Sequence, residues 1–188
     1  MNFSAYAETL KPEIMHFGQN APHAYFIPFE RGQDASLARS ESERLILLNG
    51  EWAFRYYESV NDLPDDFSPE RETLSDSIPV PSVWQLHGCG DKQYTNVRYP
   101  IPYDPPYVPA DNPCGLYRRT VNVDKREDSV YTLTFEGADS CLFLFVNGRF
   151  IGCGQVSHSP KEFDVTDALK AGENSIAVLV LKLSLIHI

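Results

Sequence analysis

Clusters of basic residues and long apolar runs are both missing from this sequence. Acidic side chains outnumber basic ones 26 to 16, which leaves a net charge of −10. Nucleic acids and anionic membranes require basic surfaces, so neither is an expected partner. No apolar run approaches the ~20 residues of a membrane span. The first twenty residues also lack the basic and then apolar pattern of a secretion signal, so we expect a cytoplasmic protein.

Closely spaced cysteine pairs are missing as well. The four cysteines are Cys89, Cys114, Cys141 and Cys153, and no two of them have C-x2-C spacing. Two disulfides or a zinc site are the alternatives to free thiols. Because no export signal is present and Cys141 lies in an apolar run, we expect free thiols and no metal site.

Patterns of helical spacing are scarce, whereas strand patterns are frequent. A turn at Asn49-Gly50 leads into an aromatic run that places Trp52, Phe54 and Tyr56 on one face. Residues 78–88 contain prolines that suit an edge strand. Two half-buried strands are expected over 116–123 and 130–137, and further strands around Phe163 and over 175–181. One helical turn is expected at 167–170, ended by a glycine at 172.

The run 141–154, CLFLFVNGRFIGCG, predicts a β-hairpin. Its central Asn-Gly pair tolerates positive φ at both positions, as a tight turn between antiparallel strands requires. Apolar residues on both faces of 141–146 indicate a central strand. At least seven strands and almost no helix predict an all-β fold, a β-sandwich or jelly roll.

Residues 93–115 hold six of the fourteen prolines of the chain. Proline lacks a backbone donor and biases the preceding residue toward extended geometry, so this segment is expected to be an ordered, extended loop. The polar residues 1–44, interrupted by three prolines, are expected to form an arm lying on the surface.

Several motifs from about residue 48 to residue 182 occur in the order found in a known family. They are LNGEWAF, VPSVWQLHG, YTNVRYPI, PPYVPADNPCGLYRRT, FEGADSCLFLFVNGRFIGCGQVSHSPKEFDVT and AGENSIAVLVL. The chain therefore resembles the N-terminal sugar-binding domain of family 2 glycoside hydrolases, and among these the bacterial β-galactosidases. The resemblance implies a galactose-binding-domain-like jelly roll over 45–182, incomplete at its C-terminal end.

Residues 183–188 depart from the family pattern. The resembled proteins continue with Trp-Ser-Asp-Gly, whereas this chain reads LSLIHI and keeps only the serine. We interpret 183–188 as a tail that is not native to the domain.

The resemblance also implies a function. Parent enzymes of this type hydrolyse terminal non-reducing β-D-galactose residues, as in lactose, with retention. Their two catalytic glutamates lie in a (β/α)8 barrel that this chain lacks, so no residue here is expected to be catalytic and the isolated chain should be inactive. Mg²⁺ and Na⁺ are expected for the parent enzyme, which is also expected to form a homo-oligomer.

Asn96 and Val97 are the substrate-binding residues that the resemblance implies. In the resembled enzymes the YTNV segment reaches the rim of the active site, where its asparagine touches the galactosyl group. The alternative is that Asn96 only bonds its own backbone in a turn.

Other candidate residues have ordinary structural explanations. The acidic sets are Asp65 with Asp66 and Glu162 with Asp164 and Asp167, which we interpret as solvated loop carboxylates. His87 and His158 lack a carboxylate at ligand spacing, so surface or hydrogen-bonded histidines are expected. Trp52 and Trp84 have the residue type that stacks on sugars, but a strand context favours core packing.

Two other functions remain open, a stand-alone carbohydrate-binding module and a structural or oligomerisation domain.

Overall fold

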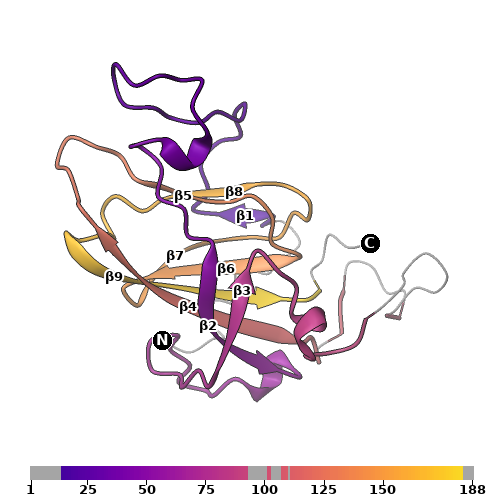
Figure 1. Cartoon of the computed structure of the whole chain (residues 1–188). Helices are drawn as coiled ribbons and strands as arrows, with labels where there is room; N and C mark the ends of the chain where they lie inside the picture. Colours follow the sequence, from indigo (N-terminus) through magenta and orange to yellow (C-terminus); the bar gives the residue numbers. More distant parts are fainter. Residues whose placement is uncertain (1–13, 93–100, 103–106, 110, 184–188) are drawn as a thin grey trace.

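The computed structural model describes residues 14–92, 101–102, 107–109 and 111–183. Within them, nine strands form two antiparallel sheets (Figure 1). The larger sheet has the order β1-β7-β6-β9-β4-β2-β3, and β5 pairs with β8 in the smaller one. The strand bounds are His16–Phe17 (β1), Gly50–Tyr57 (β2), Asp76–Val80 (β3), Cys114–Val123 (β4), Thr132–Phe135 (β5), Cys141–Val146 (β6), Arg149–Gly154 (β7), Lys161–Asp164 (β8) and Gly172–Leu181 (β9). Short 3-10 segments cover Arg39–Glu41 (η2), Val60–Asp62 (η3) and Trp84–His87 (η4).

The middle of the larger sheet is buried on both faces. Strand β6 lies between β7 and β9, and all of its residues are buried. Leu142 and Leu144 point into one apolar cluster, whereas Phe143 and Phe145 point into another. The predicted central strand is confirmed, and its burial between two clusters explains why it is apolar on both faces.

The predicted hairpin joins β6 to β7. Asn147 and Gly148 have φ values of 51° and 76°, the left-handed conformation that a tight hairpin turn needs. The pairing of β6 with β7 shifts between Leu144 and Phe145, and the shift leaves Ile151 as an extra residue in β7.

The smaller sheet packs on the first face of the larger one. Leu133 and Phe135 of β5 and Phe163 of β8 contact the cluster that contains Leu142 and Leu144. Figure 1 shows β5 and β8 lying over the β6–β7 end of the larger sheet. The all-β, jelly-roll-like β-sandwich predicted from the sequence is therefore confirmed.

The second face of the larger sheet is covered by residues 58–74, which we call the strap. Leu63 and Phe67 of the strap are buried in the cluster that contains Phe143 and Phe145. The Arg118 guanidinium, on β4, donates to the backbone carbonyls of three strap residues, Pro69, Glu70 and Glu72, at 2.8–3.1 Å. Asp65 and Asp66 of the strap are exposed, as expected of solvated carboxylates, whereas its apolar residues complete the second core.

The N-terminal segment connects the two sheets. β1 pairs with β7 at the edge of the larger sheet, and Gln19 forms an isolated bridge with Phe163 of the smaller one. Between them, Gly18 has a φ of 69°, and a Cβ at this position would lie 2.5 Å from the Ile151 carbonyl oxygen. Residues 16–20 therefore close one side of the sandwich, and most of them stay exposed there.

The rest of the arm is held against the sandwich mainly by polar contacts. The Glu30 carboxylate accepts from the Arg126 and Arg44 guanidinium groups, both at 2.8 Å. The backbone N–H of Arg31 and the Arg126 guanidinium lower the pKa of Glu30 to about 2. Two further pairs join the arm to the smaller sheet and the end of β5, His23 with Glu162 and Arg39 with Glu136.

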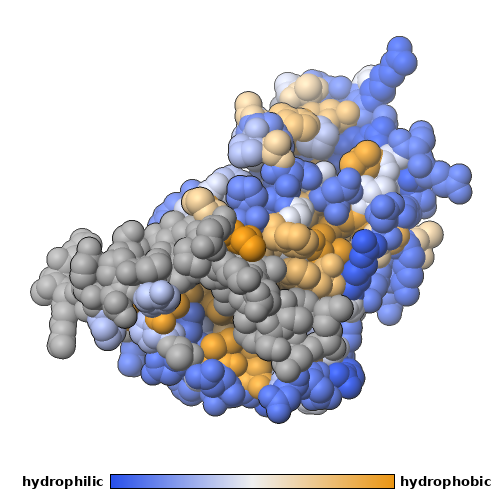
Figure 2. All heavy atoms as spheres, turned by 180° about the vertical axis from the view of Figure 1, so that it is seen from behind, coloured by the Kyte–Doolittle hydropathy of each residue, from blue (hydrophilic) through white to orange (hydrophobic). Residues whose placement is uncertain are grey.

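The exposed surface is mainly hydrophilic, with separate apolar areas. Figure 2 shows blue side chains interrupted by orange ones on the face seen from behind. Tyr25, Phe26 and Val130 are among the large apolar side chains that are most exposed. Among the described residues, no helix is long and apolar enough to cross a membrane.

Two local predictions need correction. Trp84 is buried as expected, but it lies in the 3-10 segment η4 rather than in a strand context. The helical turn expected at 167–170 is instead a hydrogen-bonded turn closed by the backbone N–H groups of Ala168 and Leu169, which donate to Val165 O at 3.0 Å. Gly172, expected to end a helix, is the first residue of β9.

Candidate functional site

Asn96 and Val97, the predicted substrate-binding residues, lie outside the described residues. A hollow of about 430 Å³ is lined by residues that precede and follow the proline-rich segment in the sequence. Asp91 and Pro113 line it, the first just before the proline-rich segment and the second near its end. The other lining residues are Tyr56, Glu58, Gly88, Gly90 and Lys182. We call this space the loop-base hollow.

The loop-base hollow contains several hydrogen-bonding groups. Glu58 and Asp91 supply carboxylates, Lys182 an ammonium group and Tyr56 a hydroxyl. Burial raises the pKa of Tyr56 to about 12, so its hydroxyl is protonated near neutral pH. A Cβ at Gly90 would lie 2.8 Å from this hydroxyl oxygen, so glycine keeps the space beside it open. Such a mixture of donors and acceptors suits hydroxylated ligands.

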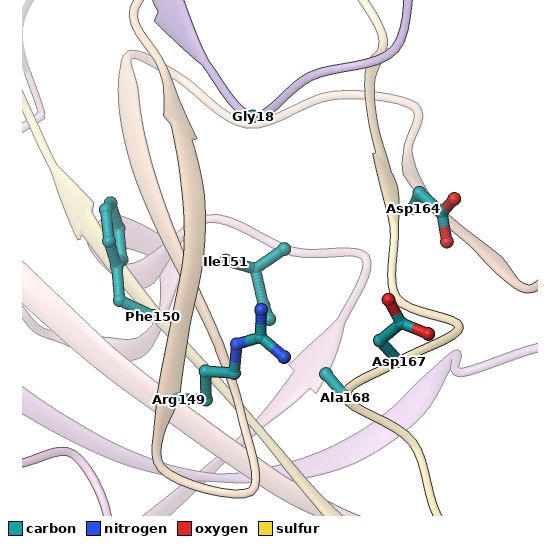
Figure 3. A pocket seen from close by; sticks show the side chains of 7 residues that line it. All are labelled: Gly18, Arg149, Phe150, Ile151, Asp164, Asp167 and Ala168. Atoms are coloured by element: carbon teal, nitrogen blue, oxygen red, sulfur yellow. The ribbon is translucent and has the colours of Figure 1, made fainter.

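A second hollow, of about 260 Å³, lies between β7 and the turn after β8. Its lining residues are Gly18, Arg149, Phe150, Ile151, Asp164, Asp167 and Ala168. Figure 3 shows Arg149 and Ile151 extending from one side and Asp167 facing them from the other, while the Phe150 ring and the Asp164 carboxylate point away. We call this space the turn hollow.

Sequence reasoning did not identify the turn hollow. Asp167 was interpreted as a solvated carboxylate, and Arg149 was seen only as part of the hairpin. The one available signal was the Asn-Gly turn, which places Arg149 at the start of β7. Arg149 and Asp167 line the same hollow because of how the two sheets stack, and no local pattern encodes that stacking.

The remaining candidates lie apart from one another. Asp65 and Asp66 are exposed on the strap, where Asp66 pairs with Arg71 at 3.2 Å. The ring Nε2 of His87 is 2.6 Å from the Ser82 hydroxyl, in agreement with the predicted hydrogen-bonded histidine. His158 is exposed, with a φ of 57°.

The cysteines and tryptophans are placed as structural residues rather than as ligand-binding ones. Among the described residues, no three histidine, cysteine, aspartate or glutamate side chains cluster in a way that would hold a metal ion. The cysteines are free thiols, as predicted, and three of the four are buried. Trp52 and Trp84 are 4% and 5% exposed, so both belong to the core and neither offers a face to a sugar.

Most of the chain matches a known domain family. Residues 45–186 match the family model described as "Glycosyl hydrolases family 2, sugar binding domain". The chain belongs to glycosyl hydrolase family 2. Within this family it is a sugar-binding domain, as the sequence motifs indicated.

Two similar relatives are bacterial β-galactosidases. The β-galactosidase of Actinobacillus pleuropneumoniae is 46% identical over 172 residues, and that of Staphylococcus xylosus is 42% identical over 175. These matches cover 91% and 92% of the chain. The chain spans 17% of the length of each of these two relatives.

Solved structures of the same family share the fold. The β-glucuronidase of Bifidobacterium dentium, solved in complex with coumarin-3-O-glucuronide, has a TM-score of 0.51 and 25% identity over 71% of this chain and 19% of that one. The β-glucuronidase of Faecalibacterium prausnitzii has a TM-score of 0.52 and 21% identity over 72% of this chain and 20% of that one. The second likeness bears on the fold alone.

Proposed function

We propose that this chain is the sugar-binding domain of a β-galactosidase that hydrolyses terminal non-reducing β-D-galactosides with retention. The observation that carries the proposal is the 46% and 42% identity to two β-galactosidases over almost the whole chain. The β-glucuronidase structures share the fold at 25% identity or less. Fold alone does not separate these substrates, so the higher identity favours the galactosides.

The domain would contribute to substrate binding rather than to bond cleavage. In this proposal Asn96 contacts the galactosyl group from the proline-rich segment, with Val97 beside it. Asp91 and Pro113, which precede and follow Asn96 in the sequence, both line the loop-base hollow, and its mixed polar lining is compatible with a sugar. Stiff backbone around the contact would limit the entropy lost on binding.

The catalytic chemistry would come from elsewhere in the parent enzyme. Retaining glycosidases use two carboxyl groups about 5 Å apart, one as nucleophile and the other as acid and base. We propose that both belong to a barrel domain of the parent, that Mg²⁺ and Na⁺ are held mainly outside this domain, and that the parent is a cytoplasmic homo-oligomer. The isolated chain should then show no hydrolysis of o-nitrophenyl β-D-galactoside.

A chimera tests the proposal directly. Residues 14–183 would replace the corresponding segment of the Actinobacillus pleuropneumoniae β-galactosidase, chosen for its 46% identity to this chain. The chimera should hydrolyse o-nitrophenyl β-D-galactoside and not the matching β-D-glucuronide. Asn96→Ala should raise KM or lower kcat/KM by about tenfold, the loss of one good hydrogen bond to a sugar hydroxyl.

Two controls make the result interpretable. Asn122→Ala changes an exposed asparagine on β4 and should leave the kinetics unchanged. Size-exclusion chromatography and circular dichroism should show that each variant is folded. A folded chimera in which Asn96→Ala has wild-type kcat and KM would refute the sugar contact, and a folded chimera that prefers the glucuronide would refute the assigned substrate.

A further inference from the structure

The turn hollow places two opposite charges on facing walls without joining them. Arg149 and Asp167 both line it, and both are exposed (Figure 3). Among the described residues, neither side chain has a hydrogen-bond or ion-pair partner. Single unpaired charges are ordinary on a protein surface. Here they converge on one concave space, which is the arrangement of a binding site.

The wall that carries Arg149 is fixed to the wall that carries Asp167. The side-chain amide of Asn147, next to the hairpin turn, donates to the Ala168 carbonyl at 2.8 Å and to Asn174 Oδ1 at 2.9 Å. The backbone N–H of Ser175 donates back to Asn147 Oδ1 at 3.0 Å. Asn147 is exposed, but Asn174 is only 1% exposed and anchors this network in the core, so the network holds the two turns in one relative position.

The turn that carries Asp167 is also rigid by itself. The Lys125 ammonium group donates to the carbonyls of Thr166 and Leu169 at 2.7 and 2.8 Å. The backbone N–H of Thr166 donates to Asp164 Oδ1 at 2.9 Å. Because these contacts order the turn before any ligand arrives, binding in the hollow would cost little conformational entropy.

Two aliphatic side chains are among the residues that line the turn hollow. They belong to Ile151, the extra residue of β7, and to Ala168. Gly18 brings the backbone after β1 close to Ile151, and no larger residue fits there without meeting the Ile151 carbonyl. The hollow thus combines some aliphatic surface with the guanidinium of Arg149 and the carboxylate of Asp167.

Size and charge limit what this space can hold. Its volume of about 260 Å³ is below the ~300–1,000 Å³ of sites for drug-sized ligands, so it suits one small polar molecule. The Asp164 carboxylate points away from the hollow but adds a second negative charge beside it, and hydrogen bonds from the side chain and backbone of Thr166 lower its pKa. Anionic ligands are disfavoured by this balance.

We propose that the turn hollow is a second saccharide site, which binds one neutral pyranoside unit. The Arg149 guanidinium would donate to one hydroxyl oxygen, the Asp167 carboxylate would accept from a neighbouring hydroxyl, and Ile151 would contact the C–H face of the ring. The choice of a galactoside as ligand rests on the proposed function, whereas the location of the site rests on the geometry of the hollow.

Titration of the 188-residue chain with methyl β-D-galactopyranoside, followed by ¹H–¹⁵N NMR, tests the site. Chemical-shift changes should centre on residues 149–151 and 164–168, with a Kd on the order of 1 mM. Arg149→Ala and Asp167→Asn should each weaken binding at least tenfold. Arg31→Ala and Asp65→Asn, which change exposed charges elsewhere, should leave the Kd unchanged.

Equilibrium dialysis with the chimera provides a second measurement within a folded enzyme. Two galactoside equivalents should bind per chain, and Arg149→Ala should reduce this to one with hydrolysis intact. A single equivalent that Arg149→Ala leaves unchanged would overturn the second site while the proposed function stands. Binding of glycine at residues 149–151 in place of the sugar would overturn the ligand class.

Discussion

Phe67→Ala is the sharpest test of how the second face of the larger sheet is covered. Phe67 is only 1% exposed and lies in the strap, which contains no β-strand over residues 58–74. Its ring belongs to the cluster that contains Phe143 and Phe145. If the strap is an integral part of the core, removing this ring should destabilise the whole domain.

The expected loss follows from the burial of the ring. Full burial of a phenylalanine side chain is worth about 1.5–3 kcal/mol, and the cavity left behind brings typical Phe→Ala losses to about 3–5 kcal/mol. The strap is irregular, so its backbone can move partly into the vacated space. We therefore expect the lower end of the range, a loss of about 3 kcal/mol in the free energy of unfolding.

Urea denaturation, followed by circular dichroism, measures this loss. With a slope of about 2 kcal/mol/M, the unfolding midpoint should fall by about 1.5 M. Phe26→Ala is a matched control, because Phe26 is 64% exposed and should change stability by no more than about 0.5 kcal/mol. If both variants unfold at the wild-type midpoint, the strap does not form part of the core.

Three further predictions concern the arm, the asparagine network and the contact of β1 with β7. The pKa of His23 is raised because its two ring nitrogens face the Ala24 carbonyl and the Glu162 carboxylate. The protonated ring therefore stabilises the folded arm. This stabilisation is complete below the unfolded pKa near 6.5 and is lost as the pH rises through the higher folded pKa. After correction for the intrinsic pH dependence of amide exchange, the protection of residues 20–44 should fall over that window in the wild type and stay constant in His23→Gln; identical protection profiles would contradict this role. Asn174→Ala should lower the free energy of unfolding, measured by urea denaturation, by about 2–3 kcal/mol. The exposed control Asn122→Ala should lower it by at most about 0.5 kcal/mol, and equal losses in the two variants would rule out a structural network. Gly152→Ala places a Cβ against the Phe17 carbonyl oxygen and 2.9 Å from the Phe163 ring. The free energy of unfolding should therefore fall by about 1–3 kcal/mol, and the backbone amides of β1 should exchange faster with solvent. Gly137→Ala, with open space around it, is the control, and equal effects of the two would disprove the close contact.

The sequence predicted best those elements whose signal is local. The Asn147-Gly148 turn was identifiable because few residue pairs accept two positive φ values. The central strand β6 was identifiable because its apolar residues alternate toward two cores. Both predictions needed only neighbouring residues, which is why they agree with the structure.

Elements that depend on distant partners were missed. β1 has only two residues and forms because β7 offers an unpaired edge. Lys161 is 1% exposed although lysines are seldom buried, and its ammonium group donates to the Ala138 and Val156 carbonyls at 2.9 and 2.8 Å. Burial lowers the pKa of this lysine. No pattern around Lys161 in the sequence indicates these carbonyl acceptors.

The candidate sites divide in the same way. Asn96 and Val97 were identified through a motif, and their contact with a sugar stays a prediction because both lie outside the described residues. Arg149 and Asp167 carry no motif, and they meet only because the hairpin of the larger sheet lies beside the turn that follows the smaller one. The stacking of the sheets, rather than the residues themselves, creates the turn hollow.

The closure of the sandwich by residues 16–20 has a consequence for biosynthesis. The side-chain amide of Gln19 donates to the carbonyl of Cys153, 134 residues further along the chain. During translation, residues 16–20 therefore cannot form these contacts until β7 and β8 have left the ribosome. Pairing between segments so distant in sequence is slow. Until then the outer edges of β7 and β8 carry unpaired backbone groups that can pair with another chain. Residues 16–20 remove these exposed edges once they pair with β7 and bridge to β8.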